Sequence, residues 1–312
     1  QNPMVHNERY AILIAGGGVQ TSSKTKKTKT SLNYPAFWND ISELYNRLKN
    51  DYKYDPVNIY MLDFNNDGTL DSQAVYRDGI RIFGRATEWN LIRTFDEIRN
   101  KSTRNDFLFF TSATHGSKTS TPQYPDQSAI CLIRRDKSDC AFLPYLNIKK
   151  MVTGEKISEQ ERSDGDTPPQ SQKTPIIYSR GLFIFWACTP TASVISDSKT
   201  IVLTSSKKEE DSYVSLVRKD MFGNWIPYQP DTHLSFLYAG VHFDIWTQPT
   251  IYTGIIPNIG TLSSPNSVKY FFDKGYESAR QNYKDKLFGG VEYDSRSTPE
   301  ISDASLASST YL

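Results

Sequence analysis

The chain has 312 residues, 38% of them hydrophobic, and a formal net charge of +1 at pH 7. Such a chain can form one large α/β domain or two smaller ones. The near-neutral charge argues against a nucleic-acid-binding protein, because phosphate neutralisation needs a basic excess, and no apolar run approaches the ~20 residues of a membrane span.

The first predicted element is a buried strand over residues 9–15, which is followed by three glycines at positions 16–18. This turn lacks the GxGxxG spacing of dinucleotide-binding loops and the lysine of a phosphate loop, so we exclude nucleotide binding there. Pro35 opens a predicted helix in which apolar residues recur at helical spacing as far as Leu48. A second strand is predicted at residues 57–62.

A helix that begins near Thr87 leads into a third hydrophobic strand over 105–111, which ends shortly before His115. The order βαβαβ predicts parallel strands with right-handed crossovers. A continuous apolar run, 181–187, ends at Cys188 and is typical of a central strand buried on both faces. Ligands bind outside the carboxyl ends of such strands, so His115 and Cys188 would meet there if the two strands are neighbours.

The three cysteines are an odd number, and two of them are symmetrically placed. Cys131 and Cys140 flank a polar turn inside two alternating segments, and they could face each other across a hairpin. The pattern is equally compatible with a disulfide and with two unpaired thiols. Cys188 is left over in either case, and a leftover thiol is the one to examine for reactivity.

Beyond the Cys188 strand, the sequence predicts another strand at residues 200–206 and a helix from about Ser267. Two segments are almost entirely polar. Residues 154–173 are typical of a long exposed loop that is flexible and open to proteolysis, and residues 295–312 of an extended or disordered C-terminal tail. We therefore expect a single domain over residues 1–294.

A thiol beside an imidazole is typical of nucleophilic catalysis. A free cysteine with a pKa near 8.5 is only a few per cent thiolate at neutral pH, so it needs a neighbour that accepts its proton. His115 can be that general base. The backbone N–H groups of Cys188 and of the Gly116 loop are candidate donors to the oxyanion of acyl transfer, and the glycine lets the backbone approach a substrate closely.

His-Gly-Ser after one hydrophobic strand and Ala-Cys after the next resemble the caspase-hemoglobinase clan of cysteine peptidases. Within that clan the chain is most similar to the legumain group, which includes asparaginyl endopeptidases and the catalytic subunit of GPI transamidase. The resemblance covers residues 9–245 and implies a caspase-like three-layer α-β-α sandwich with a mostly parallel central sheet. Further matching segments are Tyr10–Gly16, Asn33-Tyr34, Val57–Tyr60, Thr204–Ser206 and Glu210–Tyr213.

The resemblance assigns roles to individual residues. The residues of the reaction would be the nucleophile Cys188, the general base and acid His115, and Gly116 as an oxyanion donor with the Cys188 amide. Asn33 matches the asparagine that orients the histidine, although a helix-flanking asparagine is the alternative. Ser205 and Ser206 match the segment that lines the substrate cleft and pairs with the peptide backbone.

The chain departs from the legumain pattern around the substrate pocket. Asparagine-specific legumains have Arg-His shortly after the Asn-Tyr pair and an acidic residue just before Ala-Cys. Here Pro35-Ala36 and Trp186 hold those places. We therefore expect a less charged pocket with Trp186 in its wall and a P1 preference that is not strictly Asn. Thr189-Pro190 replaces small and acidic residues and would narrow the oxyanion region.

A calcium loop is the one cofactor site that the sequence suggests, although the expected chemistry requires no cofactor. Oxygen-bearing residues stand at loop positions one, three, five and nine, with a glycine at six, as calcium loops need. Ala74 holds the place of the bidentate glutamate, so an Asx/Gly-rich turn is the alternative. The residues that would bind the ion are Asp63, Asn65, Asp67 and Asp71.

The leading hypothesis is a cysteine endopeptidase that hydrolyses peptide bonds through a thioester on Cys188. Three alternatives stay open: a transamidase or ligase that uses the same thioester, a non-catalytic binding protein, and a Cys/His hydrolase of small amides or esters. We expect a peptide or protein substrate, no nucleic acid, no membrane span and a monomer. The start at Gln1 and the Cys131/Cys140 pair favour an exported bacterial protein whose signal peptide has been removed.

Overall fold

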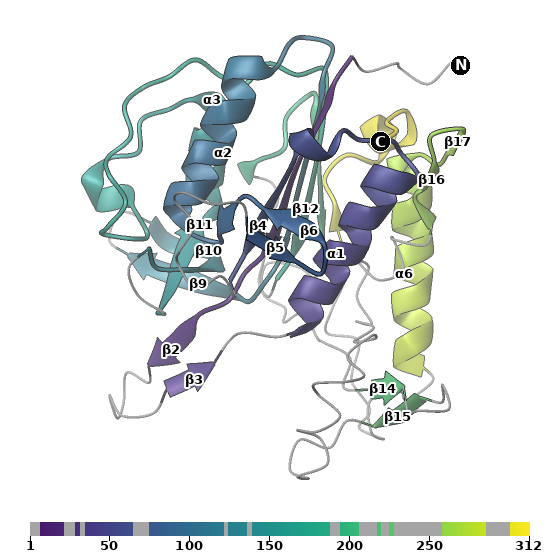
Figure 1. Ribbon diagram of the computed structural model, residues 1–312, viewed down its shortest axis with the longest axis horizontal. Coiled ribbons are helices and arrows are strands. Elements are labelled where there is room, and N and C mark those ends of the chain that lie inside the picture. Colours follow the sequence, from purple (N-terminus) through teal and green to yellow (C-terminus); the bar gives the residue numbers. More distant parts are fainter. Residues whose placement is uncertain are drawn as a thin grey trace.

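The computed structural model describes residues 7–21, 29–31, 35–64, 75–121, 124–135, 139–187, 194–205, 217–219, 225–227, 258–284 and 300–312. Its centre is a seven-stranded sheet (Figure 1). The strands are β1 (Arg9–Ala15), β4 (Ile59–Asp63), β7 (Gly84–Arg85), β8 (Phe107–Ala113), β12 (Arg180–Trp186), β13 (Thr200–Thr204) and β18 (Glu300–Ile301). They lie in the order β18-β13-β12-β8-β1-β4-β7. Neighbours pair in parallel, except that β18 is antiparallel to β13.

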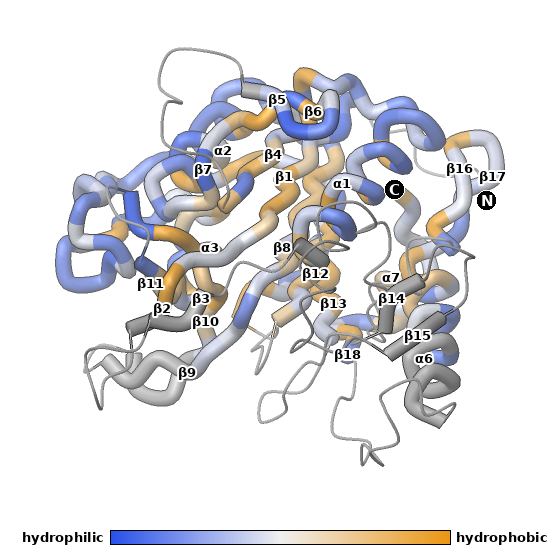
Figure 2. The backbone as a smooth tube through the Cα atoms, turned by 60° about the horizontal axis from the view of Figure 1, so that its bottom comes forward, coloured by the Kyte–Doolittle hydropathy of each residue, from blue (hydrophilic) through white to orange (hydrophobic). Residues whose placement is uncertain are grey.

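Helices cover both faces of this sheet and make a fold of three layers (Figure 1). On one face lie α1 (Pro35–Asn50), α6 (Val268–Lys284) and α7 (Ala304–Ser308), and on the other α2 (Glu88–Lys101) and α3 (Tyr145–Thr153). Along β1, Leu13 faces the α1 side and Ile12 the α2 side, and both are fully buried. Burial on both faces explains why these strands are continuous apolar runs, and Figure 2 shows the hydrophobic residues concentrated in them.

The remaining strands form smaller sheets that are separate from the central one. A three-stranded antiparallel sheet contains β9 (Gly116–Thr121), β10 (Tyr124–Ile133) and β11 (Cys140–Pro144). Short hairpins pair β2 (Val19–Thr21) with β3 (Lys29–Ser31), β5 (Val75–Arg77) with β6 (Ile80–Ile82), β14 (Val217–Lys219) with β15 (Trp225–Pro227), and β16 (Gly260–Thr261) with β17 (Ser264–Pro265). Two 3₁₀ turns are η1 (Pro56–Asn58) and η2 (Glu159–Glu161).

The element order predicted from the sequence is confirmed. The first strand has the expected bounds, α1 begins at Pro35, and Thr87 caps α2 by accepting a hydrogen bond from the Asn90 N–H. The expected hairpin is formed by β10 and β11, and Cys131 and Cys140 are joined by a disulfide with a Cα–Cα distance of 6.0 Å. No helix in the described ranges is long and apolar enough to cross a membrane.

The loop of residues 154–173 is fastened to the domain, contrary to the expectation of a flexible segment. Gly154 ends α3 with a φ of 76°, and its carbonyl accepts the N–H of Lys173, which closes the base of the loop. At the far end, the buried carboxylate of Glu88 accepts the backbone N–H groups of Ser163 and Asp164. The loop is therefore attached to the domain at its base and at the start of α2.

The C-terminal residues 300–312 are also part of the fold rather than a disordered tail. β18 adds a strand to the edge of the sheet, and Asp303 caps α7 by accepting the N–H of Leu306. Ala307 and Leu312 are buried in the core on the α1 face. The few apolar residues of this polar segment are thus the ones that dock it.

The loop contact of Glu88 can be tested by substitution. Glu88→Ala leaves two loop N–H groups without their acceptor. We therefore expect the free energy of opening the loop to fall by about 2 kcal/mol and trypsin to cleave at Arg162 about 30-fold faster. Cleavage is followed by mass spectrometry at neutral pH. Glu97→Ala is the matched control on the same helix, because it removes an ion pair with Lys101 and a hydrogen bond from the Tyr60 hydroxyl, neither of which involves the loop. Equal cleavage rates in the two variants would contradict the assignment.

Candidate active site

The strands that precede His115 and Cys188 are neighbours in the sheet. Each residue of β12 lies opposite the β8 residue 73 positions earlier, from Arg180 opposite Phe107 to Trp186 opposite Ala113. The N–H of Thr114 then donates to the carbonyl of Trp186 at 3.2 Å, one residue beyond the last pair. The segments that follow β8 and β12 are therefore still side by side where they leave the sheet.

The end of β8 also lies at the point where the order of the sheet reverses. β1 is flanked by β4 on one side and by β8 on the other, and α1 and α2, which follow β1 and β4, cover opposite faces. In open α/β sheets this switch point is where the loops diverge and ligands bind. Gly16 follows β1 there and donates its N–H to the carbonyl of Ala113 at 3.0 Å.

Gly16 is required because the chain passes very close to the segment before His115. A Cβ at this position would lie 2.3 Å from the hydroxyl oxygen of Thr114 and 2.5 Å from the carbonyl oxygen of Cys131. No larger residue fits without displacing backbone. The glycine turn after β1 has no nucleotide-binding pattern; its first glycine instead allows the chain to pack closely beside the candidate site.

The backbone of His115 is held by the disulfide hairpin. Its carbonyl accepts the N–H of Cys131 at 2.7 Å, and the hydroxyl of Thr114 donates to the carbonyl of Cys131 at 2.6 Å. The disulfide joins Cys131 to Cys140 at the start of β11. Gly116 opens β9 directly after the histidine and pairs with Ile130 of β10. These hydrogen bonds and the disulfide therefore fix the backbone of His115.

The imidazole of His115 is largely buried against an aromatic wall. The ring of Phe37, from the first turn of α1, meets it edge to face at a centroid distance of 5.3 Å, and Phe37 meets Trp186 in the same way at 5.4 Å. Burial lowers the pKa of His115 to about 4, because the apolar surroundings disfavour the imidazolium. The ring is therefore in its neutral form at pH 7, and in these surroundings it is a weaker base than a free imidazole.

Two residues predicted to bind substrate turn out to be buried. Trp186 is 2% exposed and its ring packs on Phe37 inside the core. Ser205 is 1% exposed; its N–H donates to Phe185 and its hydroxyl to the carbonyl of Ala187 at 3.3 Å. The Ser205 side chain therefore supports the segment at the end of β12, and any contact with a substrate would have to come from its backbone.

Several predicted site residues lie outside the described residues. They are Asn33, Cys188, Thr189, Pro190 and Ser206 at the candidate site, and Asn65, Asp67 and Asp71 of the calcium loop. Asp63, at the start of that loop, is buried and paired with Arg77 at 2.8 Å. Within the described ranges, no group of three or more His, Cys, Asp or Glu side chains could hold a metal ion.

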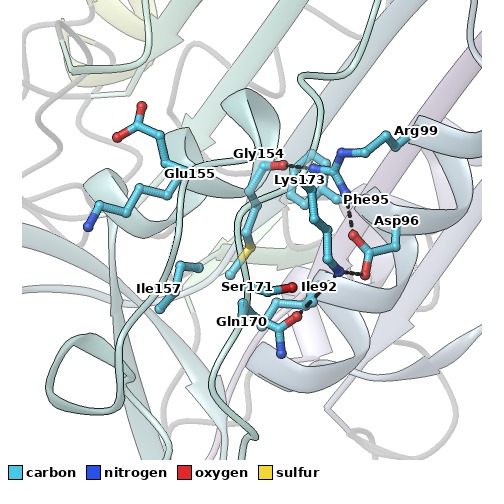
Figure 3. Close-up of a pocket in the computed structure, with 12 residues that line it drawn as sticks. Ile92, Phe95, Asp96, Arg99, Gly154, Glu155, Ile157, Gln170, Ser171 and Lys173 are labelled. Carbon is cyan, nitrogen blue, oxygen red and sulfur yellow. Dashed lines mark hydrogen bonds and ion pairs between the residues drawn. The ribbon is translucent and has the colours of Figure 1, made fainter.

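A shallow pocket on the opposite face of the sheet does not include any candidate residue. It lies between α2, α3 and the 154–173 loop, with an apolar floor that includes Ile92, Phe95 and Ile157 (Figure 3). Asp96 pairs with both Arg99 and Lys173 at its rim. Since both cations are held by Asp96 and Lys173 belongs to the loop, the pocket is best explained as the seam where the loop is attached.

Comparisons with known proteins give information on the fold and none on the chemistry of the site. No protein-family model matches the chain, and no curated protein matches it significantly. Among solved structures, the chain is similar to the crystal structure of protein GSU0716 from Geobacter sulfurreducens, with a TM-score of 0.51 and 10% sequence identity. The match covers 98% of this chain and 99% of that chain. At this identity it shows a shared fold alone.

The close approach at Gly16 predicts a position-specific cost. Gly16→Ala forces the added methyl group against Thr114 and the backbone of Cys131, and we expect a loss of about 1–3 kcal/mol in the free energy of unfolding. Gly165→Ala is the control, since nothing lies within 4 Å of its added Cβ. It should change stability by less than about 0.5 kcal/mol. Urea unfolding of both variants measures the difference, and equal effects would contradict the packing described for Gly16.

The buried imidazole predicts a pH-dependent stability. The pKa of His115 is about 4 when folded and about 6.5 when unfolded, so the unfolded chain binds more protons between these values. The contribution of His115 is complete above about pH 6.5 and is lost as the pH falls towards about 4, at a cost of about 2–3 kcal/mol. The stability of the wild type relative to His115→Gln should fall by that amount over this range in urea unfolding. A difference that does not vary with pH would contradict the burial of a neutral ring.

Proposed function

We propose that the protein is a caspase-like cysteine endopeptidase of the legumain type, with Cys188 as nucleophile and His115 as general base. The constant register of β8 and β12 carries the proposal. In the sequence, Cys188 is the second residue after β12 and His115 the second residue after β8, so both follow the ends of paired strands. Trp186, two residues before Cys188 in the sequence, packs on Phe37, which also contacts His115.

The reaction follows from these positions. The neutral imidazole of His115 takes the proton of the Cys188 thiol, and the thiolate attacks the carbonyl carbon of the scissile peptide bond. The N–H groups of Cys188 and Gly116 donate to the oxyanion of the tetrahedral intermediate. The intermediate collapses to a thioester when the C–N bond breaks and the leaving amine takes the proton from His115. A water molecule, deprotonated by His115, then hydrolyses the thioester and frees the thiol and the carboxylate product.

Three further features agree with this proposal. The strand order β4-β1-β8-β12-β13 brings together the two strands that precede the proposed catalytic residues. Ser205 holds the carbonyl of Ala187, the residue before the nucleophile, and would limit its movement. Asn33 precedes α1, whose first turn contacts His115, so we keep it as the residue proposed to orient the imidazole.

The disulfide bears on where such an enzyme would work. Disulfides persist in oxidising compartments, and the Cys131–Cys140 bond here supports the backbone of His115 itself. We therefore propose that the protein is exported and that its substrates are extracellular or periplasmic peptides and proteins. The same argument requires assays in which Cys188 is reduced while the disulfide is intact.

The proposal is tested by cleavage of a mixed peptide library, with products identified by mass spectrometry. The wild type should cut, Cys188→Ala should be inactive, and His115→Gln should lose at least about 100-fold in rate. Gly165→Ala, which changes an open surface position, should cut like the wild type. Residues on the N-terminal side of the cuts report the P1 preference. Cleavage that survives in Cys188→Ala, or no cleavage and no labelling of Cys188 by peptide electrophiles in the wild type, would contradict the proposal.

A further inference from the structure

Phe37 links the ends of the two strands that carry the proposed catalytic residues. It lies in the first turn of α1, is 2% exposed, and comes from a segment far from both strands in the sequence. Its ring meets the imidazole of His115 at an interplanar angle of 82° and the indole of Trp186 at 80°. One side chain therefore contacts the second residue after β8 and the last residue of β12.

These contacts restrict the movement of the imidazole. Edge-to-face pairs have a preferred geometry worth about 0.5–1.5 kcal/mol beyond burial, and tightly packed side chains stay in one rotamer. Phe37 is itself held by Trp186, so it is a fixed wall rather than a mobile neighbour. With its backbone bound to Cys131 and its α1 side closed by Phe37, His115 keeps little freedom to turn away from the end of β12.

We propose that Phe37 is a positioning residue for peptide hydrolysis: its ring closes the α1 side of His115 and holds the imidazole towards the nucleophile. This inference rests on the proposed function. The same ring keeps water from one side of the imidazole, which agrees with the burial that lowers the pKa of His115. Phe37 would thus limit the orientation of the base and help to lower its pKa without touching the substrate.

Phe95 provides a matched control for a purely structural role. It is a phenylalanine of equal burial, 1% exposed, on a helix that covers the opposite face of the sheet. Its ring stacks on Phe110 inside the core, at a centroid distance of 6.0 Å. Phe95→Leu and Phe37→Leu remove the same atoms from comparable surroundings, so their difference isolates the contact with His115.

The experiment combines kinetics with NMR titration of the histidine rings, of which the chain has four. His115→Gln identifies the resonance of His115. In Phe37→Leu we expect kcat to fall about 10- to 100-fold with KM within about threefold, as for a misplaced catalytic group. The pKa of His115 should rise by about one unit, and the acid limb of kcat/KM should move with it. Phe95→Leu should leave the kinetics and the titration of His115 as in the wild type.

Equal kinetics and equal titration of His115 in the two variants would overturn the role of Phe37. If Phe37→Leu fails to fold, Phe37→Met fills the space with a flexible chain and serves in its place. Failure of the proposed function is recognised separately, because the wild type would then neither hydrolyse peptides nor react at Cys188. In that case the titration still tests the contact between Phe37 and His115. A raised pKa of His115 in Phe37→Leu supports the positioning role of Phe37, and an unchanged pKa overturns that role.

Discussion

The parallel pairing of β8 with β12 is the constraint on which the site depends. Both strands are buried on both faces, so a slip of one residue would turn every core side chain of one strand to the wrong layer. The register is therefore determined by the whole core and not by the residues at the edge. The segments that follow Ala113 and Trp186 therefore start from neighbouring positions at one edge of the sheet.

The surroundings of His115 add rigidity from three sides. The disulfide hairpin binds its carbonyl, the glycine turn after β1 packs beneath the preceding threonine, and Phe37 covers the ring. Each of these elements comes from a different part of the chain, and each is itself fixed by packing or by a covalent bond. Rigid support of this kind is what a proton acceptor needs, because rate falls steeply when it leaves its productive position. Burial lowers the pKa of the ring to about 4, so the ring is neutral at neutral pH.

The sequence predicted the elements that hydrophobicity determines and missed those that hydrogen bonds determine. Continuous apolar runs located β1, β8 and β12, and Pro35 and Thr87 marked the starts of two helices. The loop of residues 154–173 looked flexible because its attachment depends on polar groups, and Asp164 is fully buried through hydrogen bonds that no apolar pattern reveals. Phe37 was one more apolar residue at helical spacing. Its contact with His115 needs the three-dimensional crossing of α1 over the sheet.

The claim that positions 115 and 188 meet can be measured by disulfide trapping. Under the proposal, His115→Cys brings a second thiol near Cys188, and the spacing of about 4.8 Å between neighbouring strands is within the Cα range of disulfides. After mild oxidation, peptide mapping without reduction should find a cross-link between positions 115 and 188. Ser117→Cys, two residues further along β9, should give no such cross-link. A folded His115→Cys variant in which Cys188 stays unlinked would contradict the alignment on which the proposed enzyme rests.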